Sequence, residues 1–231
     1  MANRGGHRYH KTHKKQAMAR KAALFDLDGV VLDTERQYDI IWGRIGHKYH
    51  PEPPDFARQI KGQTLTSILN AHFHNEADRR DVERMLDTFE AEEMKYDFVD
   101  GARAYIISLR AAGVQTAVVT SSNNKKMADV RRNVADFDSL FDVVVTAELT
   151  ARSKPAPDCF LKGAELLGRK PEECVVFEDS RNGMKAGRAA GMLTVGVATT
   201  FGREVAADLA DVVIDNFVGI APSRFFNIGQ E

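Results

Sequence analysis

Short apolar runs and longer amphipathic segments alternate along most of the chain. The first run, Ala22–Phe25, is continuous and too short for a helix, which is typical of a strand covered on both faces. Similar runs follow at Gln115–Val119, Val143–Thr146, Cys174–Phe177, Leu193–Val197 and Val212–Ile214. Helical periods separate these runs, as in Ala102–Ala112 and Cys159–Leu167. This alternation favours right-handed crossovers, so we predict an α/β fold with a Rossmann-like parallel sheet.

Residues 37–97 interrupt the alternation, because they contain helical periods and no β-rich run. Apolar side chains recur at helical spacing from Tyr38 to Tyr49, and three prolines then end that pattern. Two further helices are predicted over Leu65–Phe73 and from Val82 to Met94. Three consecutive helices without a strand indicate a small helical bundle inserted into the α/β core.

The predicted organisation follows from these two patterns. The core comprises residues 21–36 and 99–220, and the inserted helical cap comprises residues 37–98. Residues 1–20 and 221–231 are predicted to be tails. The crossings between core and cap, at Thr34–Arg36 and Phe98–Gly101, are the candidate hinges.

Charge is distributed unevenly along the 231 residues, although the net charge is only −1. Residues 1–21 contain seven basic side chains and no acidic one, which leaves 25 basic against 33 acidic side chains in the remainder. We interpret the basic segment as a solvated, disordered tail, the alternative being an arm for a polyanion. Because it shows neither interleaved aromatic residues nor a known nucleic-acid module, we expect no nucleic-acid partner.

Two features of the composition concern location. Cys159 and Cys174 are the only cysteines, too few for a disulfide framework, which fits a reducing cytoplasm. No apolar run approaches the roughly 18 residues of a membrane span, and the basic N-terminus lacks the apolar segment of a signal peptide. We therefore predict a cytoplasmic protein with no membrane partner. The sequence does not reveal the oligomeric state, and a monomer is our expectation.

Asp26 and Asp28 directly follow the first predicted strand, and Gly29 then turns the chain. Side chains two residues apart along a strand lie on the same side, so both carboxylates can face one site. An open α/β sheet binds its ligands at this end of its strands. Carboxylates this close repel each other, and a divalent cation or a shared proton would resolve the conflict. The alternative is an ordinary turn, which accounts for Gly29 better than for two aspartates.

Polar side chains also follow other predicted strands. Thr120 ends the second core strand and Ser121 opens the next turn, where a hydroxyl and backbone N–H groups can bind phosphate oxygens. Lys154 precedes Pro155-Ala156-Pro157, and its ammonium can neutralise phosphoryl charge. Glu178 and Asp179 end another strand. Each could instead be a helix cap or a solvated loop residue, but their shared position at strand ends predicts one phosphate site.

The order of these signals resembles the haloacid dehalogenase (HAD) superfamily of phosphotransferases. Asp26-x-Asp28-Gly29-Val30 resembles its motif I, Thr120 motif II, the Lys154 segment motif III, and Glu178-Asp179-Ser180 motif IV. The resemblance extends from Ala23 to about Val197. The position of the cap resembles subclass I enzymes with a helical C1 cap, and the motifs are most similar to the β-phosphoglucomutase-like phosphatases.

This resemblance implies a mechanism and a cofactor. Asp26 would be the nucleophile that forms an aspartyl-phosphate, and Asp28 the general acid and base. Mg²⁺ would be held by Asp26, by Asp28 through its backbone carbonyl, and by Asp179, with Glu178 in an outer position or as a second-choice ligand. Thr120, with the turn at Ser121, and Lys154 would hold the phosphoryl oxygens. The expected activity is Mg²⁺-dependent hydrolysis of a small phosphorylated metabolite, and we expect a sugar phosphate.

A phosphosugar mutase is the first alternative. True β-phosphoglucomutases resemble this chain around Lys61, but they carry an arginine shortly afterwards for a second phosphate, where this chain has Leu65. Near motif II they have a lysine where this chain has Asn123, with Lys125 close by. Both departures favour hydrolysis. The cap residues expected to select the substrate are Lys61, Gln63 and Thr64.

The second alternative belongs to another class, a non-catalytic HAD-fold protein that binds a metabolite, or binds a polyanion through its basic tail. The presence of all four motifs argues against it. Mg²⁺-dependent turnover of a generic phosphate ester would distinguish an enzyme from such a binding protein.

Overall fold

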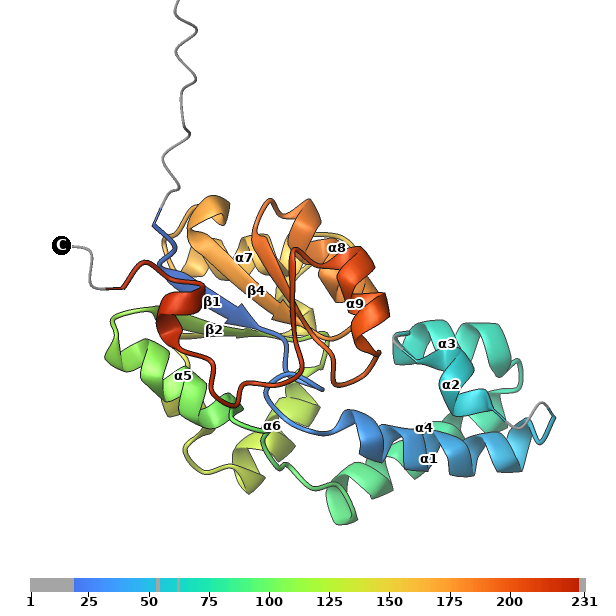
Figure 1. Ribbon diagram of the computed structural model, residues 1–231. Coiled ribbons are helices and arrows are strands. Elements are labelled where there is room, and N and C mark those ends of the chain that lie inside the picture. The colour runs from blue at the N-terminus through green and yellow to red at the C-terminus, as the bar shows by residue number, and fades with distance from the viewer. Residues whose placement is uncertain (1–18, 53–54, 62, 229–231) are drawn as a thin grey trace, which may run out of the picture.

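A computed structural model describes residues 19–52, 55–61 and 63–228. Within these residues, six strands form one sheet in the order β3-β2-β1-β4-β5-β6, and every neighbouring pair is parallel (Figure 1). The strands are β1 (Ala22–Phe25), β2 (Gln115–Val119), β3 (Val143–Val145), β4 (Cys174–Glu178), β5 (Leu193–Val197) and β6 (Val212–Ile214). The predicted α/β fold with a parallel sheet is confirmed. Most of the predicted N-terminal tail, residues 1–18, lies outside the described residues.

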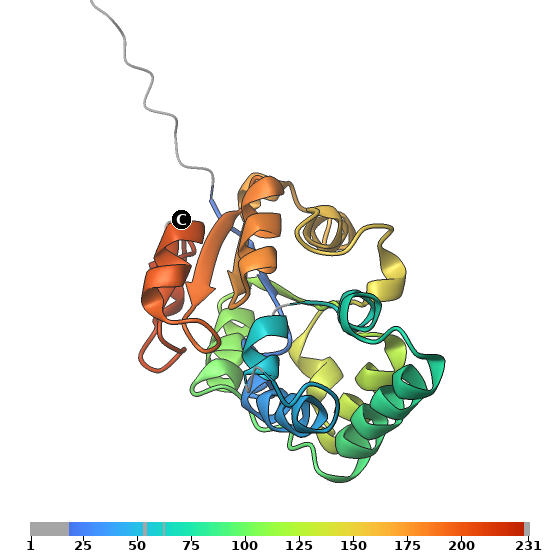
Figure 2. The same cartoon turned by 90° about the vertical axis from the view of Figure 1, so that its right-hand side faces the viewer.

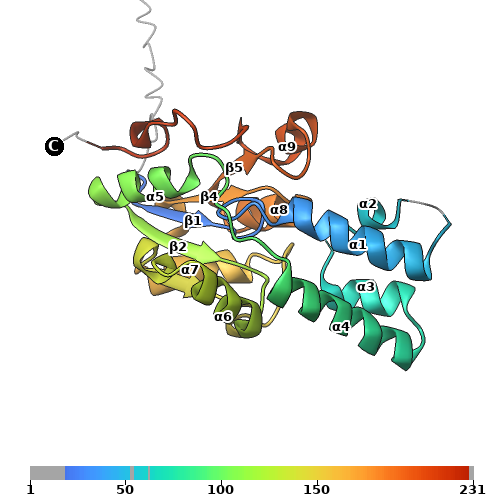
Figure 3. The same cartoon turned by 90° about the horizontal axis from the view of Figure 1, so that it is seen from below.

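Helices cover both faces of this sheet. The core helices are α5 (Ala102–Ala111), α6 (Asn124–Asn133), α7 (Asp158–Leu166), α8 (Arg181–Ala189) and α9 (Arg203–Leu209). Successive residues of β1 point to opposite faces: Leu24 belongs to the cluster that contains Phe160 of α7, and Phe25 to the cluster that contains Tyr105 of α5. Accordingly, α5 and α7 lie on opposite sides of β1 and β2 (Figure 3). With both faces covered, apolar runs are required throughout each strand.

Four helices between β1 and α5 lie beyond the carboxyl ends of the strands. They are α1 (Glu35–Tyr49), α2 (Phe56–Ile60), α3 (Leu65–His72) and α4 (Glu76–Glu92). Figure 2 views the molecule from the side of these helices, which lie nearest the viewer. Helix α1 packs against α2 and α4, and α4 also contacts α6 of the core. Their buried side chains belong to the same apolar cluster as one face of the sheet.

The sequence pattern did not predict two of the helices. Helix α2 has only five residues, of which Phe56 and Ile60 are buried, and α9 has seven, of which Ala206 is buried. The third predicted cap helix ends at Glu92, before Met94, which is buried in the coil that leads back to the core. In the described part of the predicted C-terminal tail, Phe225 and Phe226 are buried and pack in the core. None of the described helices is both long and apolar enough to cross a membrane.

Candidate active site

The carboxyl ends of β1, β2 and β4 bring the predicted motifs to one place. Asp26 follows β1, Thr120 follows β2, and Glu178 and Asp179 lie at the end of β4. These strands are direct neighbours in the sheet, with β1 in the middle. As a result, carboxylate oxygens of Asp26, Glu178 and Asp179 lie within 4.8 Å of one another.

Lys154, from the loop before α7, inserts its ammonium among these carboxylates. Its Nζ donates to Asp26, to Oε1 of Glu178 at 2.7 Å and to the carbonyl of Val119 at 3.2 Å. The lysine is 9 % exposed, and Glu178 is fully buried. Although burial opposes the charged form, Asp26 and Glu178 raise the pKa of Lys154 above its ordinary value, so the ammonium persists.

One ammonium does not balance three carboxylates. Burial raises the pKa of Asp26 to about 7, against the lowering effect of Lys154, and burial next to Glu178 raises the pKa of Asp179. Burial is the larger cause of both shifts, and the neighbouring carboxylates add to it, so the ionised forms lack sufficient compensation in the site. Three converging carboxylates are also the oxygen donors that a hard divalent cation prefers. The residues present therefore fit such a cation.

Two glycines leave room for these carboxylates. Gly29 has φ of +75°, and a Cβ there would lie 2.1 Å from Oδ2 of Asp179, so a side chain would be both strained and obstructed. A Cβ at Gly183, in the first turn of α8, would lie 1.7 Å from Oε1 of Glu178. The other oxygen of Glu178 accepts from the N–H of Ser180 at 2.9 Å and from its hydroxyl at 3.0 Å. The orientation of Glu178 is therefore fixed from both sides.

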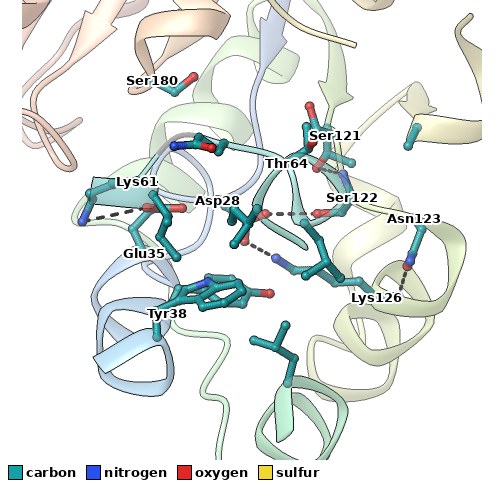
Figure 4. A pocket seen from close by; sticks show the side chains of 18 of the residues that line it. Asp28, Glu35, Tyr38, Lys61, Thr64, Ser121, Ser122, Asn123, Lys126 and Ser180 are labelled. Atoms are coloured by element: carbon teal, nitrogen blue, oxygen red, sulfur yellow. Dashed lines mark hydrogen bonds and ion pairs between the residues drawn. The ribbon is translucent and has the colours of Figure 1, made fainter. Parts of the chain in front are cut away.

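Asp28 lines the same cavity as Asp26 but has a different set of partners (Figure 4). Its Oδ1 accepts from the hydroxyl of Thr34 and from Nζ of Lys126 at 2.6 Å, and its Oδ2 accepts from the hydroxyl of Ser122 at 3.1 Å. Burial alone would raise the pKa of Asp28, but Lys126 and the two hydroxyls outweigh it and lower the pKa. The two aspartates thus share a site but not an environment.

Thr120 and Ser121 lie where phosphate binding was predicted. Thr120 is 3 % exposed, and its hydroxyl oxygen accepts from the N–H of Ser122 at 2.9 Å. Ser121 is exposed, and both residues line the cavity. A direct contact of either residue with phosphate remains a prediction.

The three cap residues named from the sequence also line this cavity, which has a volume of about 680 Å³. Lys61 forms an ion pair with Asp39 of α1 at 2.7 Å, and its Nζ lies 4.0 Å from Glu35 (Figure 4). Gln63 donates to the carbonyl of Gln59 at 3.2 Å, and Thr64 caps α3 by accepting from the N–H of Ser67. Their role in substrate selection remains a prediction.

Lys126 also lines the cavity but was not identified from the sequence, which drew attention to Lys125. Asn123 begins α6 by accepting from the N–H of Lys126, and the helical phase then directs Lys126 inward and Lys125 to Asp87 at the rim. A signal was present, because Lys126 lies four residues before the buried Val130 and therefore on the same face of the helix.

The cavity wall is acidic overall. Its acidic side chains are Asp26, Asp28, Glu35, Asp39, Glu83, Asp87, Glu90, Glu178 and Asp179. Its basic side chains are Lys61, Lys125, Lys126 and Lys154, with no arginine among the described residues of the lining. Each of these lysines is already paired with a carboxylate of the protein. The wall therefore offers many hydrogen-bond acceptors and little uncompensated positive charge.

Comparisons with known proteins agree on one family. The family model of the haloacid dehalogenase-like hydrolases matches residues 20–191 of this chain. The chain is 36% identical to hexitol phosphatase A of Escherichia coli over 77% of this chain and 82% of that protein. It is 32% identical to β-phosphoglucomutase of Mycobacterium bovis over 84% of this chain and 88% of that protein. A HAD hydrolase of family IA from Entamoeba histolytica, 22% identical, superposes with a TM-score of 0.75 over 89% of this chain and 97% of that one.

Proposed function

The chain belongs to the haloacid dehalogenase-like hydrolases, as its four motifs predicted, and from that premise we propose that it hydrolyses a sugar or polyol monophosphate. The observation that carries the proposal is the pair of aspartates at the end of β1. Asp26 contacts Lys154 and the carboxylate cluster, whereas Asp28 contacts Lys126. Two carboxyl groups in distinct environments suit distinct roles. Their order in motif I assigns Asp26 as the nucleophile and Asp28 as the acid and base, and a divalent cation bound beside Asp26 would favour its ionised, nucleophilic form.

In the proposed reaction, Asp26 attacks phosphorus and the ester P–O bond breaks, which forms an aspartyl-phosphate. Lys126 favours the ionised form of Asp28 in the free enzyme, so Asp28 must first take up a proton, which it then gives to the departing oxygen. Asp28 then takes a proton from the water that hydrolyses the intermediate, so phosphate is released and Asp26 is restored. Lys154 and Thr120 hold the phosphoryl oxygens. Positioning and charge neutralisation supply most of the acceleration in such reactions.

We further propose that Asp26 and Asp179, with the backbone carbonyl of Asp28, hold Mg²⁺. When bound, Mg²⁺ supplies positive charge to the phosphoryl oxygens. Glu178 suits an outer position, because both of its oxygens already accept hydrogen bonds from Lys154 and Ser180. Helices α1 to α4 would act as the cap that closes over the site and selects the leaving group.

Metal dependence gives a direct prediction. Chelation should abolish phosphate release, and Mg²⁺ should restore it. Asp179→Asn should raise the Mg²⁺ concentration for half-maximal activity by at least about 10- to 100-fold, since the loss of groups that orient a bound metal already has effects of this size. Asp208→Asn, at an exposed position on α9, is the matched control and should titrate like the wild type. An unchanged titration for Asp179→Asn would contradict the metal assignment.

Hydrolysis rather than a mutase reaction is supported by the charge of the cavity. A phosphosugar mutase must hold a substrate with two phosphates. Here the lysines of the wall are already paired, and further acids such as Glu83 would repel a second phosphate. Neutral hydroxyl groups, by contrast, find many acceptors in such a wall.

The test is steady-state phosphate release, with and without Mg²⁺, from hexitol phosphates, glucose 6-phosphate and β-glucose 1-phosphate. Hexitol phosphates are included because the E. coli relative is named a hexitol phosphatase. We expect release from several monoesters and no conversion of β-glucose 1-phosphate to glucose 6-phosphate. Conversion without phosphate release would establish the mutase instead, and no turnover of any ester would favour a binding protein. A monomeric, cytoplasmic enzyme remains our prediction from the sequence.

A further inference from the structure

Asp28 is held by donors from three separate segments. Thr34 lies at the start of α1, Ser122 lies in the loop after β2, and Lys126 lies in the first turn of α6. These donors occupy both carboxylate oxygens, and the side chain of Asp28 is 17% exposed. A carboxylate bound on both oxygens is fixed in orientation as well as in position.

Lys126 is itself fixed between the core and the helices of the proposed cap. Its side chain is 9% exposed, and its Nζ lies 2.6 Å from Asp28 and 4.5 Å from the centroid of the Tyr38 ring (Figure 4). The hydroxyl of Tyr38 donates to Glu90 of α4 at 2.7 Å. The ammonium thus lies against an aromatic face on one side and the carboxylate on the other, an arrangement that favours a cation.

The neighbouring lysine shows that this placement is specific. Lys125 forms an ion pair with Asp87, and the two side chains are 60% and 55% exposed. Lys126 is enclosed instead, as Lys154 is against Asp26. Each aspartate of motif I therefore has its own buried lysine, although only Lys154 belongs to a motif that the sequence revealed.

We propose that Lys126 is a positioning residue that aims Asp28 at the leaving-group oxygen. This inference rests on the proposed function, in which Asp28 protonates that oxygen. As the bond from Asp26 to phosphorus forms and the ester P–O bond breaks, the proton moves from Asp28 to the leaving oxygen. The carboxylate that this step leaves regains its ion pair with Lys126.

The choice of leaving group tests this role. Phenolate requires a proton to depart readily, whereas dinitrophenolate does not, so a misaligned acid should impair phenyl phosphate selectively. The parameter to compare is kcat/KM, because it covers the steps up to departure of the leaving group and excludes hydrolysis of the intermediate, where Asp28 acts again. In Lys126→Met, kcat/KM should fall about 10- to 100-fold for phenyl phosphate but less than about threefold for 2,4-dinitrophenyl phosphate.

Three variants make the result decisive. Lys125→Met removes an adjacent lysine and leaves the partners of Asp28 intact, so any effect should be equal for both esters. Asp28→Asn should show the same selectivity as Lys126→Met. Lys126→Gln keeps a donor and a similar length, so it provides the comparison if the methionine variant does not fold.

The results for Lys126 and Asp28 distinguish failure of this inference alone from failure of the proposed function. Equal losses for both esters in the Lys126 variants, with selective loss in Asp28→Asn, would overturn the role of Lys126 and leave that of Asp28 standing. Such equal losses would mean that Lys126 binds the phosphoryl group or the substrate. If Asp28→Asn itself shows no selectivity, the proposed acid and the inference for Lys126 both fail.

Discussion

Replacing Asp26 with asparagine should lower turnover more than about a thousandfold, as removal of a nucleophile does in other covalent enzymes. The amide has nearly the shape of the carboxylate but cannot form an aspartyl-phosphate. Lys154 keeps Glu178 and the carbonyl of Val119 as partners in this variant, so the site should retain its shape. The loss would therefore reflect chemistry rather than packing.

The stability of the same variant should not fall with its turnover. Burial raises the pKa of Asp26 to about 7, so the folded protein binds a proton more tightly than the unfolded chain. At a pH above the ordinary carboxyl pKa, ionisation of Asp26 therefore reduces the stability of the folded state. A neutral asparagine removes that effect, so without Mg²⁺ at pH 8 the melting temperature of Asp26→Asn should equal or exceed that of the wild type.

Phosphate release and thermal melting of the two proteins would check both expectations. Asp208→Asn again serves as the control for loss of an exposed carboxylate, and it should change neither quantity. Undiminished turnover in Asp26→Asn would overturn the nucleophile assignment. A large drop in its melting temperature would show instead that the carboxylate is needed for folding.

The sequence predicted the location of the site well, for a physical reason. In a parallel sheet, side chains that follow different strands meet at one edge, so Asp26, Thr120 and Asp179 could be grouped before any distance was known. The strands themselves were recognisable because burial on both faces demands continuous apolar runs. Gly29 was recognisable as a turn, and the structure adds that Asp179 fills the space that a side chain there would need.

The pairing of charges could not be predicted in the same way. Which lysine reaches Asp28 depends on the phase of α6, which Asn123 sets, and on the distance between α6 and β1. Residues far apart in the sequence meet only through packing: Lys61 and Asp39 through packing of α1 and α2, and Lys125 and Asp87 through packing of α4 against α6 of the core. Helix α2 was not predicted, because its five residues are too few to show a helical period.

Lys154→Met should impair both activity and stability, because the ammonium separates two buried carboxylates. Its removal would leave Asp26 and Glu178 facing each other without a cation, and loss of one partner of a buried ion pair typically costs about 3–5 kcal/mol. Loss of a positive group from the phosphoryl site should also lower kcat by about 100- to 1,000-fold. Urea unfolding and phosphate release measure the two effects separately.

A second substitution distinguishes the two roles of Lys154. In Lys154→Met with Glu178→Gln, one of the uncompensated carboxylates is gone, so part of the lost stability should return. Activity should stay low, because a neutral amide in place of the Glu178 carboxylate does not restore the positive charge that faces the phosphoryl oxygens. Recovery of activity along with stability would mean that Lys154 acts only through the fold. Recovery of stability alone would show that one buried ammonium both holds the ends of β1 and β4 together and serves the reaction.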